Sequence, residues 1–84
     1  MKLVYFSWIR ERLDMSDETI DLPGNVETVR DLIAWQKTRG EAFDAVFQHD
    51  AAIRVALDQE HADARTASLS GVSEIAFFPP MTGG

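Results

Sequence analysis

One segment carries the full set of signals for an amphipathic helix, and it constrains the fold more than any other part of the chain. Thr28 followed by Asp31 is typical of a capping box at a helix start, with aspartate as the acid. Residues that share one helical face follow at helical spacing: Val29, Leu32, Ile33 and Gln36. Gly40 predicts the end of this helix. A helix with one apolar face must bury that face against another layer of structure.

The segments on either side of this helix favour strands. Residues 2–9 begin as a strand, and Ser7 is expected to N-cap a short helical turn after it. Further strands are expected over residues 15–22, 52–59 and 73–78, with turns at 23–25 and 70–71. A second helical piece is indicated by the helical spacing of Phe43, Val46 and Phe47. We therefore expect a single α+β domain over residues 1–84, with one mixed sheet packed on one main helix and residues 79–84 as an extended tail.

The alternation of the first and last strands predicts an exposed aromatic pair. Leu3 and Tyr5 share one face of the first strand, opposite to Val4 and Phe6. In the last strand, Ile75 and Phe77 lie opposite to Ala76 and Phe78. If the helix covers only one face of the sheet, Phe6 and Phe78 are exposed on the other, where an apolar patch would mark a protein-binding surface. The alternative is that a loop, or the short helix after Ser7, covers both rings.

Composition excludes several classes of function. The 84 residues include 14 acidic and 8 basic side chains, and the net charge of −6 disfavours nucleic acid and anionic membrane surfaces as partners. No apolar run is long enough to span a membrane and no secretion signal is visible, so we expect a cytoplasmic protein. The chain has no cysteine, which excludes disulfides, thiolate metal sites and a cysteine nucleophile.

No other motif indicates an enzyme centre. The two histidines, His49 and His61, have acidic neighbours in sequence, but their spacing matches no metal motif, so no metal site is expected. The serines lack the G-x-S-x-G context of a nucleophile, and the internal glycines are isolated, unlike those of a phosphate-binding loop.

The C-terminal segment "AFFPPMTGG" has the form of a slender delivery arm. Pro79 and Pro80 end the last strand and stiffen the chain beyond it. The four residues that follow can reach roughly 13 Å when extended, far enough to enter a pocket of another protein. Gly83 and Gly84 lack Cβ atoms, so a narrow channel can close around the backbone and receive the ionised terminal carboxylate. The alternative is an ordinary frayed terminus.

Both ends of the chain resemble the small sulfur-carrier subunit family of molybdopterin synthase. "VYFSWIRERL" is similar to the opening strand of that family, and "EIAFFPPMTGG" is similar to its closing signature. The helix start at Thr28 and the strand ending at Asp58 and Gln59 also fit, although the family often has asparagine at the position of Asp58. The resemblance covers essentially the whole chain and implies a ubiquitin-like β-grasp fold with a flexible C-terminal Gly-Gly tail.

The resemblance also implies a mechanism and partners. A ubiquitin-activating-like adenylyltransferase would use ATP to adenylate Gly84, and a sulfur donor protein would convert the adenylate to a thiocarboxylate. The large synthase subunit would use this sulfur to build the dithiolene of molybdopterin from cyclic pyranopterin monophosphate, within a heterotetramer. The small subunit would bind no cofactor and would not be an enzyme on its own.

The resemblance assigns roles to particular residues. Residues of the tail would thread the pocket of the large subunit ahead of Gly84: Met81, Thr82 and Gly83. Residues of the docking surface would contact the partner proteins: Phe6, Phe78, Pro79 and Pro80. Arg10 would contribute an interfacial ion pair or an exposed structural contact.

Three other functions remain open. The sulfur carrier of thiamine synthesis shares the fold and the Gly-Gly end, but it is typically shorter and lacks the Phe-Phe-Pro-Pro run. A protein modifier would conjugate the same terminus to lysines. A plain interaction module would not need Gly83 and Gly84 at all.

Overall fold

The strands of the protein form one mixed sheet in the order β2-β1-β5-β3-β4. The computed structural model describes residues 1–62 and 64–80. The strands span Lys2–Tyr5 (β1), Asp17–Thr19 (β2), Arg54–Leu57 (β3), Glu60–His61 (β4) and Glu74–Phe78 (β5). β1 and β5 pair in parallel at the centre of the sheet, whereas β2, β3 and β4 join by antiparallel pairing.

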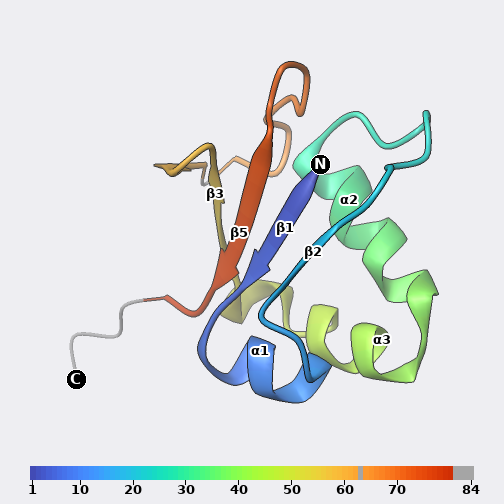
Figure 1. Ribbon diagram of the computed structural model, residues 1–84, viewed down its shortest axis with the longest axis vertical. Helices are drawn as coiled ribbons and strands as arrows, with labels where there is room; N and C mark the ends of the chain where they lie inside the picture. Colours follow the sequence, from blue (N-terminus) through green and yellow to red (C-terminus); the bar gives the residue numbers. More distant parts are fainter. Residues whose placement is uncertain (63, 81–84) are drawn as a thin grey trace.

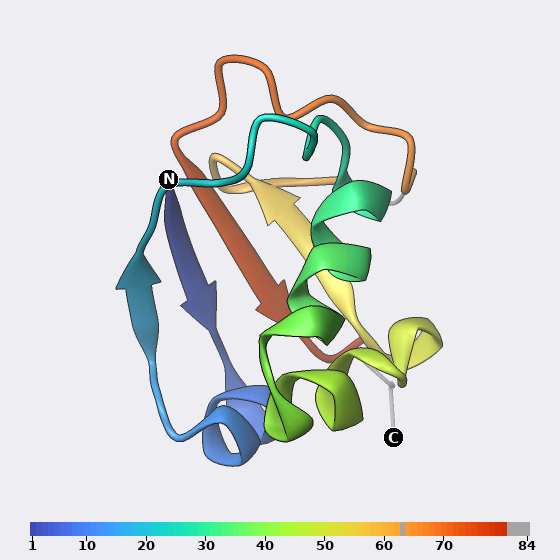
Figure 2. The same cartoon turned by 90° about the vertical axis from the view of Figure 1, so that its right-hand side faces the viewer.

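The helices cover one face of this sheet, with α2 as the main element (Figures 1 and 2). The α-helices span Ser7–Leu13 (α1), Val29–Gln36 (α2) and Glu41–Phe47 (α3), and short 3-10 helices span Lys37–Arg39 (η1) and Asp50–Ala52 (η2). The fold is the expected α+β arrangement of a mixed sheet packed on a main helix, and α3 confirms the second helical piece.

The core lies between the sheet and the helices and contains the apolar faces that the sequence predicts. Buried residues of the central strands are Leu3, Tyr5, Ile75 and Phe77. Buried residues of α2 are Val29, Leu32, Ile33 and Gln36. The Phe77 ring stacks on Tyr5 at 5.7 Å between centroids and meets Phe47 of α3 edge to face at 5.1 Å. These aromatic contacts fix the helical layer on the two central strands.

The capping box at the start of α2 is confirmed. The hydroxyl of Thr28 accepts from the backbone N–H of Asp31 at 3.2 Å, and the carboxylate of Asp31 accepts from the N–H of Thr28 at 3.2 Å. α2 itself ends at Gln36 and continues as η1, so Gly40 ends the 3-10 turn instead of the α-helix. At Gly40 the backbone has φ 145°, which lets the chain reverse into α3.

Two expectations near the N-terminus are wrong in detail. Ser7 does not cap α1: Phe6 occupies the N-cap position without a side-chain hydrogen bond, and Ser7 is the first helical residue, with φ 56°. The second strand is also shorter than residues 15–22, because only Asp17–Thr19 pair with β1. Beyond β2, the backbone of Ile20 still exchanges hydrogen bonds with Met1, at 2.9 and 3.1 Å. The side chains of Ile20 and Leu22 pack, half-buried, against the core.

Candidate functional site

The sheet face opposite the helices carries an open groove of about 390 Å³. We call it the outward groove, and its lining residues come from β1, β3, β5 and their ends: Val4, Phe6, Ala56, Gln59, Glu74, Ala76 and Phe78. The register brings Val4, Ala76 and Ala56 into one row across the three strands. The lining is mainly apolar and open to solvent, which is the form of a surface that binds another protein.

Phe6 is exposed in this groove as the alternation of β1 predicts. The Phe6 side chain is 47% exposed, the highest fraction among the large hydrophobic residues that the structure describes. Its backbone N–H donates to the carbonyl of Phe77 at 3.1 Å, and its carbonyl accepts from Ile9 at 3.2 Å. Among residues 1–62 and 64–80, neither a loop nor α1 covers the Phe6 ring, so the alternative in which both rings are covered is wrong.

Phe78 ends β5 on the same face as Phe6. It is half-buried and lines the same groove, whereas its neighbour Phe77 is fully buried on the helical side. The ring of Phe78 lies 5.2 Å from that of His61 on β4. The structure therefore brings the predicted aromatic pair, Phe6 and Phe78, together.

The chain leaves the sheet beside this aromatic pair. β1 and β5 run parallel, so the end of β5 lies at the same end of the sheet as Phe6 and α1 (Figure 1). Pro79 and Pro80 follow β5 directly and are half-buried. The remaining predicted tail residues lie outside the described residues: Met81, Thr82, Gly83 and Gly84.

Arg10 is exposed on α1 and does not line the outward groove. Within residues 1–62 and 64–80, its side chain has no hydrogen bond or ion pair. The interfacial ion pair of Arg10 stays a prediction.

Five lining residues of the outward groove were not predicted as site residues: Val4, Ala56, Gln59, Glu74 and Ala76. The alternation of β3 already places Ala56 opposite the core, so its position could have been read from the strand pattern. Gln59 had no such signal. It follows Asp58 in a turn where both residues have positive φ, 48° and 70°, without a glycine to mark the turn.

Asp58 has a structural role that explains its presence beside the groove. One of its carboxylate oxygens accepts from the backbone N–H groups of Ser73 at 3.0 Å and Glu74 at 2.9 Å. The backbone N–H of Asp58 donates to the carbonyl of Glu74 at 2.8 Å. The residue therefore fixes the β3–β4 turn to the start of β5. An asparagine side chain also presents an oxygen that can accept these bonds.

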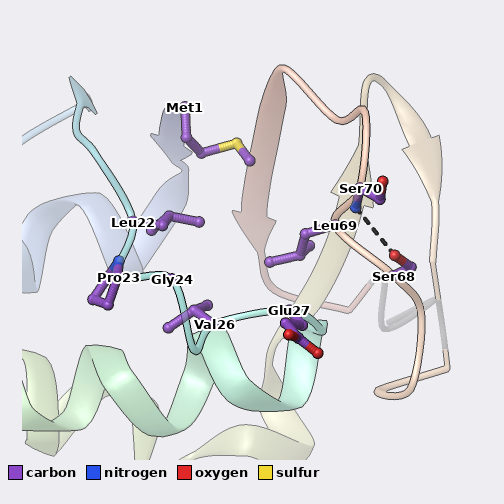
Figure 3. A pocket seen from close by; sticks show the side chains of 9 residues that line it. All are labelled: Met1, Leu22, Pro23, Gly24, Val26, Glu27, Ser68, Leu69 and Ser70. Atoms are coloured by element: carbon purple, nitrogen blue, oxygen red, sulfur yellow. Dashed lines mark hydrogen bonds between the residues drawn. The ribbon is translucent and has the colours of Figure 1, made fainter.

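A larger hollow, of about 550 Å³, lies at the other end of the sheet (Figure 3). Glu27 supplies its one carboxylate, and the other lining residues are Met1, Leu22, Pro23, Gly24, Val26, Ser68, Leu69 and Ser70. It contains no histidine or basic side chain, and it is remote from the end at which Pro79 leaves the sheet.

Among residues 1–62 and 64–80, no group of three His, Asp or Glu side chains is placed to hold a metal ion. No helix among these residues has the length and apolar character needed to cross a membrane.

Comparison with known proteins agrees with this fold. The crystal structure of SAMP1 from Haloferax volcanii is 27% identical, with a TM-score of 0.73, over 100% of this chain and 98% of SAMP1. A putative molybdopterin converting factor, subunit 1, from Pyrococcus furiosus is 24% identical, with a TM-score of 0.70, over 95% of each chain. No curated protein sequence matches significantly.

The match to a family model extends over nearly the whole sequence. The model of the ThiS family matches residues 3–84, which include all but the first residue of β1, the other groove-lining strands and the C-terminal segment. The expected ubiquitin-like fold is confirmed by the likeness to SAMP1. The protein therefore belongs to the ThiS family of small, ubiquitin-like sulfur carriers.

Proposed function

We propose that this protein is the sulfur-carrier small subunit of a molybdopterin synthase. The observation that carries the proposal is the position of the outward groove at the end of β5, where Pro79 begins the C-terminal arm (residues 79–84). Phe6 and Phe78 line the groove, and Pro79 continues directly from Phe78. A partner that covers the groove receives the arm at a defined place. The fold shared with the putative molybdopterin converting factor subunit from Pyrococcus furiosus supports this assignment.

The chemistry begins at the carboxylate of Gly84. A carboxylate does not accept a sulfur nucleophile, because oxide is too poor a leaving group. A partner adenylyltransferase therefore joins Gly84 to AMP, with ATP as the source and pyrophosphate as the product. The terminal sulfur of a donor protein's persulfide then displaces AMP, and cleavage of the resulting acyl disulfide by a second thiol leaves the thiocarboxylate. The absence of cysteine agrees with this route, since the chain has no thiol on which to store sulfur.

The large synthase subunit is the proposed acceptor of the loaded arm. Its surface covers Phe6, Phe78, Pro79 and Pro80, and Arg10 supplies an ion pair at the edge of the contact. Met81, Thr82 and Gly83 thread the pocket that receives Gly84, where the sulfur is transferred to cyclic pyranopterin monophosphate. Two small and two large subunits form the heterotetramer.

Intact-mass spectrometry tests the carrier chemistry directly. The full chain is incubated with the adenylyltransferase, ATP and a persulfide donor, and we expect a product in which one terminal oxygen is replaced by sulfur. A variant that lacks Gly84 serves as the control and should not gain sulfur. If the full chain gains no sulfur under conditions that load another carrier of the family, the carrier proposal is wrong.

A second assay separates this function from its rivals. The loaded chain is mixed with either the large molybdopterin synthase subunit and cyclic pyranopterin monophosphate, or thiazole synthase and its substrates. Molybdopterin formation supports the proposal, and thiazole formation instead identifies a thiamine carrier. Lysine conjugates of higher mass in cell extract, formed without either product, would identify a protein modifier.

A further inference from the structure

A cluster of basic side chains lies on the helical side of the molecule, away from the outward groove. Arg30, Lys37 and Arg65 line a hollow of about 210 Å³ together with Ile33, Ala34 and Asp50. The whole chain has a net charge of −6, so a hollow with three basic side chains and one acidic side chain has the opposite sign to the molecule as a whole. We call this hollow the basic groove.

α2 and η1 supply one wall of the basic groove. Arg30 and Lys37 are seven residues apart, which places both on one helical face about 10 Å apart along the axis. Ala34 lies between them and is exposed, so the floor between the two charges is shallow. Within residues 1–62 and 64–80, neither basic side chain forms a hydrogen bond or an ion pair, which leaves both charges available to a ligand.

The opposite wall is fixed by Arg65. Its guanidinium donates to the carbonyls of Asp50 at 3.0 Å and Ile53 at 2.7 Å, and it lies 2.8 Å from the carboxylate of Asp50. The carbonyl of Arg65 in turn accepts from the backbone N–H of Arg30 at 2.8 Å. Arg65 is therefore committed to structure, and its charge is offset by Asp50. The remaining positive charge of the groove belongs to Arg30 and Lys37, and Arg30 also interacts electrostatically with the carboxylate of Asp31 beside it.

We propose that the basic groove binds an acidic segment of a partner polypeptide. Two carboxylates about 10 Å apart would match Arg30 and Lys37, a spacing given on one side by acidic residues seven apart on a helix or three apart in a polyproline II segment. The exposed Ala34 lets the backbone of such a segment approach closely. Nucleic acid fits less well, because its many phosphates would also meet the acidic surface around the groove.

The basic groove and the outward groove lie on opposite sides of the sheet, so both can be occupied at the same time. α2 packs on the face of the sheet opposite to the outward groove, as Figure 2 shows with α2 in front of the sheet. A partner that covers Phe6 and Phe78 would therefore leave Arg30 and Lys37 accessible. The acidic segment can bind while the outward groove is occupied, and this inference does not depend on the reaction that the C-terminal arm serves.

Binding of a synthetic polyglutamate peptide to the ¹⁵N-labelled full chain tests the proposal by NMR. We expect saturable amide shifts confined to residues 30–37 and 64–67 that weaken as salt is raised. The double variant Arg30→Glu/Lys37→Glu should bind at least about tenfold more weakly, and the neutral variant Arg30→Gln/Lys37→Gln, which has no reversed charges to disturb the fold, should also lose affinity.

A matched control separates a local site from a general effect of charge. Lys2→Glu/Arg12→Glu makes the same change in net charge at two exposed positions outside the groove, and it should bind the peptide within about twofold of the unmodified chain. Equal losses in the two charge-reversed variants would overturn the proposal, as would the absence of saturable shifts. Inorganic phosphate that produces the same shifts at the same concentration would reduce the groove to a simple anion site and would also overturn it.

Discussion

Ser7 holds a backbone conformation that serine rarely adopts, at the point where β1 passes into α1. Its φ is 56°, in the left-handed region, and its side chain is exposed. A β-branched side chain is strained more severely in this region, whereas glycine adopts it freely. We expect Ser7→Val to lower the free energy of unfolding by about 1–2 kcal/mol and Ser7→Gly to leave it equal or slightly higher, both measured by urea denaturation.

Ala42 provides the matched control for Ser7. It is exposed within α3, an α-helix without positive φ values, so Ala42→Gly should destabilise the protein by about 1 kcal/mol. Glycine is thus expected to be tolerated at Ser7 and harmful at Ala42. If Ser7→Gly is as destabilising as Ala42→Gly, Ser7 is not in a strained conformation in solution.

Ser7 also shows why some single residues could not be predicted from the sequence. A serine after a strand and before an apolar helical pattern favours an N-cap, and only the tertiary contact between Phe6 and Phe77 moves the cap back by one residue. Asp58 and Gln59 are similar, since their left-handed turn is stabilised by the bonds of Asp58 to β5. These conformations depend on partners distant in sequence.

A polar network joins β1, β2, α2 and η1. The guanidinium of Arg39 donates to both carboxylate oxygens of Glu18, each at 2.7 Å, and to the amide oxygen of Gln36 at 2.9 Å. The buried hydroxyl of Tyr5 donates to Glu18 at 2.7 Å and accepts from Gln36 at 2.9 Å. The network links the edge strand β2 to the helical layer.

This network makes the stability of the protein depend on pH. The hydrogen bond from Arg39 holds the pKa of Glu18 below its ordinary value of 4.5. A depressed folded-state pKa adds stability that is fully present above the unfolded value and is lost as the pH falls through the folded one. Glu18→Gln should therefore flatten the decline in unfolding free energy below about pH 4.5 and cost about 1 kcal/mol at neutral pH.

Glu11 provides a control for Glu18, and Asp31 accounts for part of the acid-induced loss of stability that should persist in Glu18→Gln. Glu11 is exposed on α1, and Glu11→Gln should preserve the acidic decline. Asp31 also has a lowered pKa, because the backbone N–H of Glu27 donates to it, so Glu18→Gln should reduce the decline without abolishing it. Parallel pH profiles for Glu18→Gln and the unmodified protein would contradict the role of the network.

Elements were more predictable than their boundaries. The capping box and the apolar face of α2 are local patterns, and so is the alternation of β1, β3 and β5. These patterns can be recognised in the sequence alone because they do not depend on contacts between distant residues. The length of β2 depends on how far it pairs with β1. The end of α2 is followed by η1, and η1 contains Arg39, whose side chain bonds to Glu18 of β2. The basic groove could not be foreseen, because residues of α2 and the segment around Arg65 meet only in the folded chain.

For the molecule as a whole, the sheet separates two surfaces of different chemistry. One face carries the apolar outward groove, next to the end of β5 where Pro79 follows, and the helical side carries the basic groove. Docking through an apolar face keeps the acidic surface out of the central contact, where unpaired charges would be costly. Stability and docking should therefore depend on different aromatic side chains, even where these are adjacent in sequence.

Three phenylalanines test this separation. Phe77 is fully buried between Tyr5 and Phe47, so Phe77→Ala should lower the free energy of unfolding by about 3–5 kcal/mol. Phe6 is 47% exposed, and Phe6→Ala should cost less than about 1 kcal/mol in unfolding. The same change should weaken the affinity for the proposed partner, the large synthase subunit, by more than about 1 kcal/mol. Phe78→Ala should weaken the same affinity by more than about 1 kcal/mol, because its ring lines the same groove.

Urea denaturation and isothermal titration calorimetry measure the two effects on the same variants. Trp8 offers a control, since it is half-buried on α1 and does not line the outward groove. Trp8→Phe should retain affinity for the large subunit within about twofold. Unchanged affinity in Phe78→Ala would remove that residue from the docking surface, and unchanged affinity in both Phe6→Ala and Phe78→Ala would show that the partner binds elsewhere on the protein.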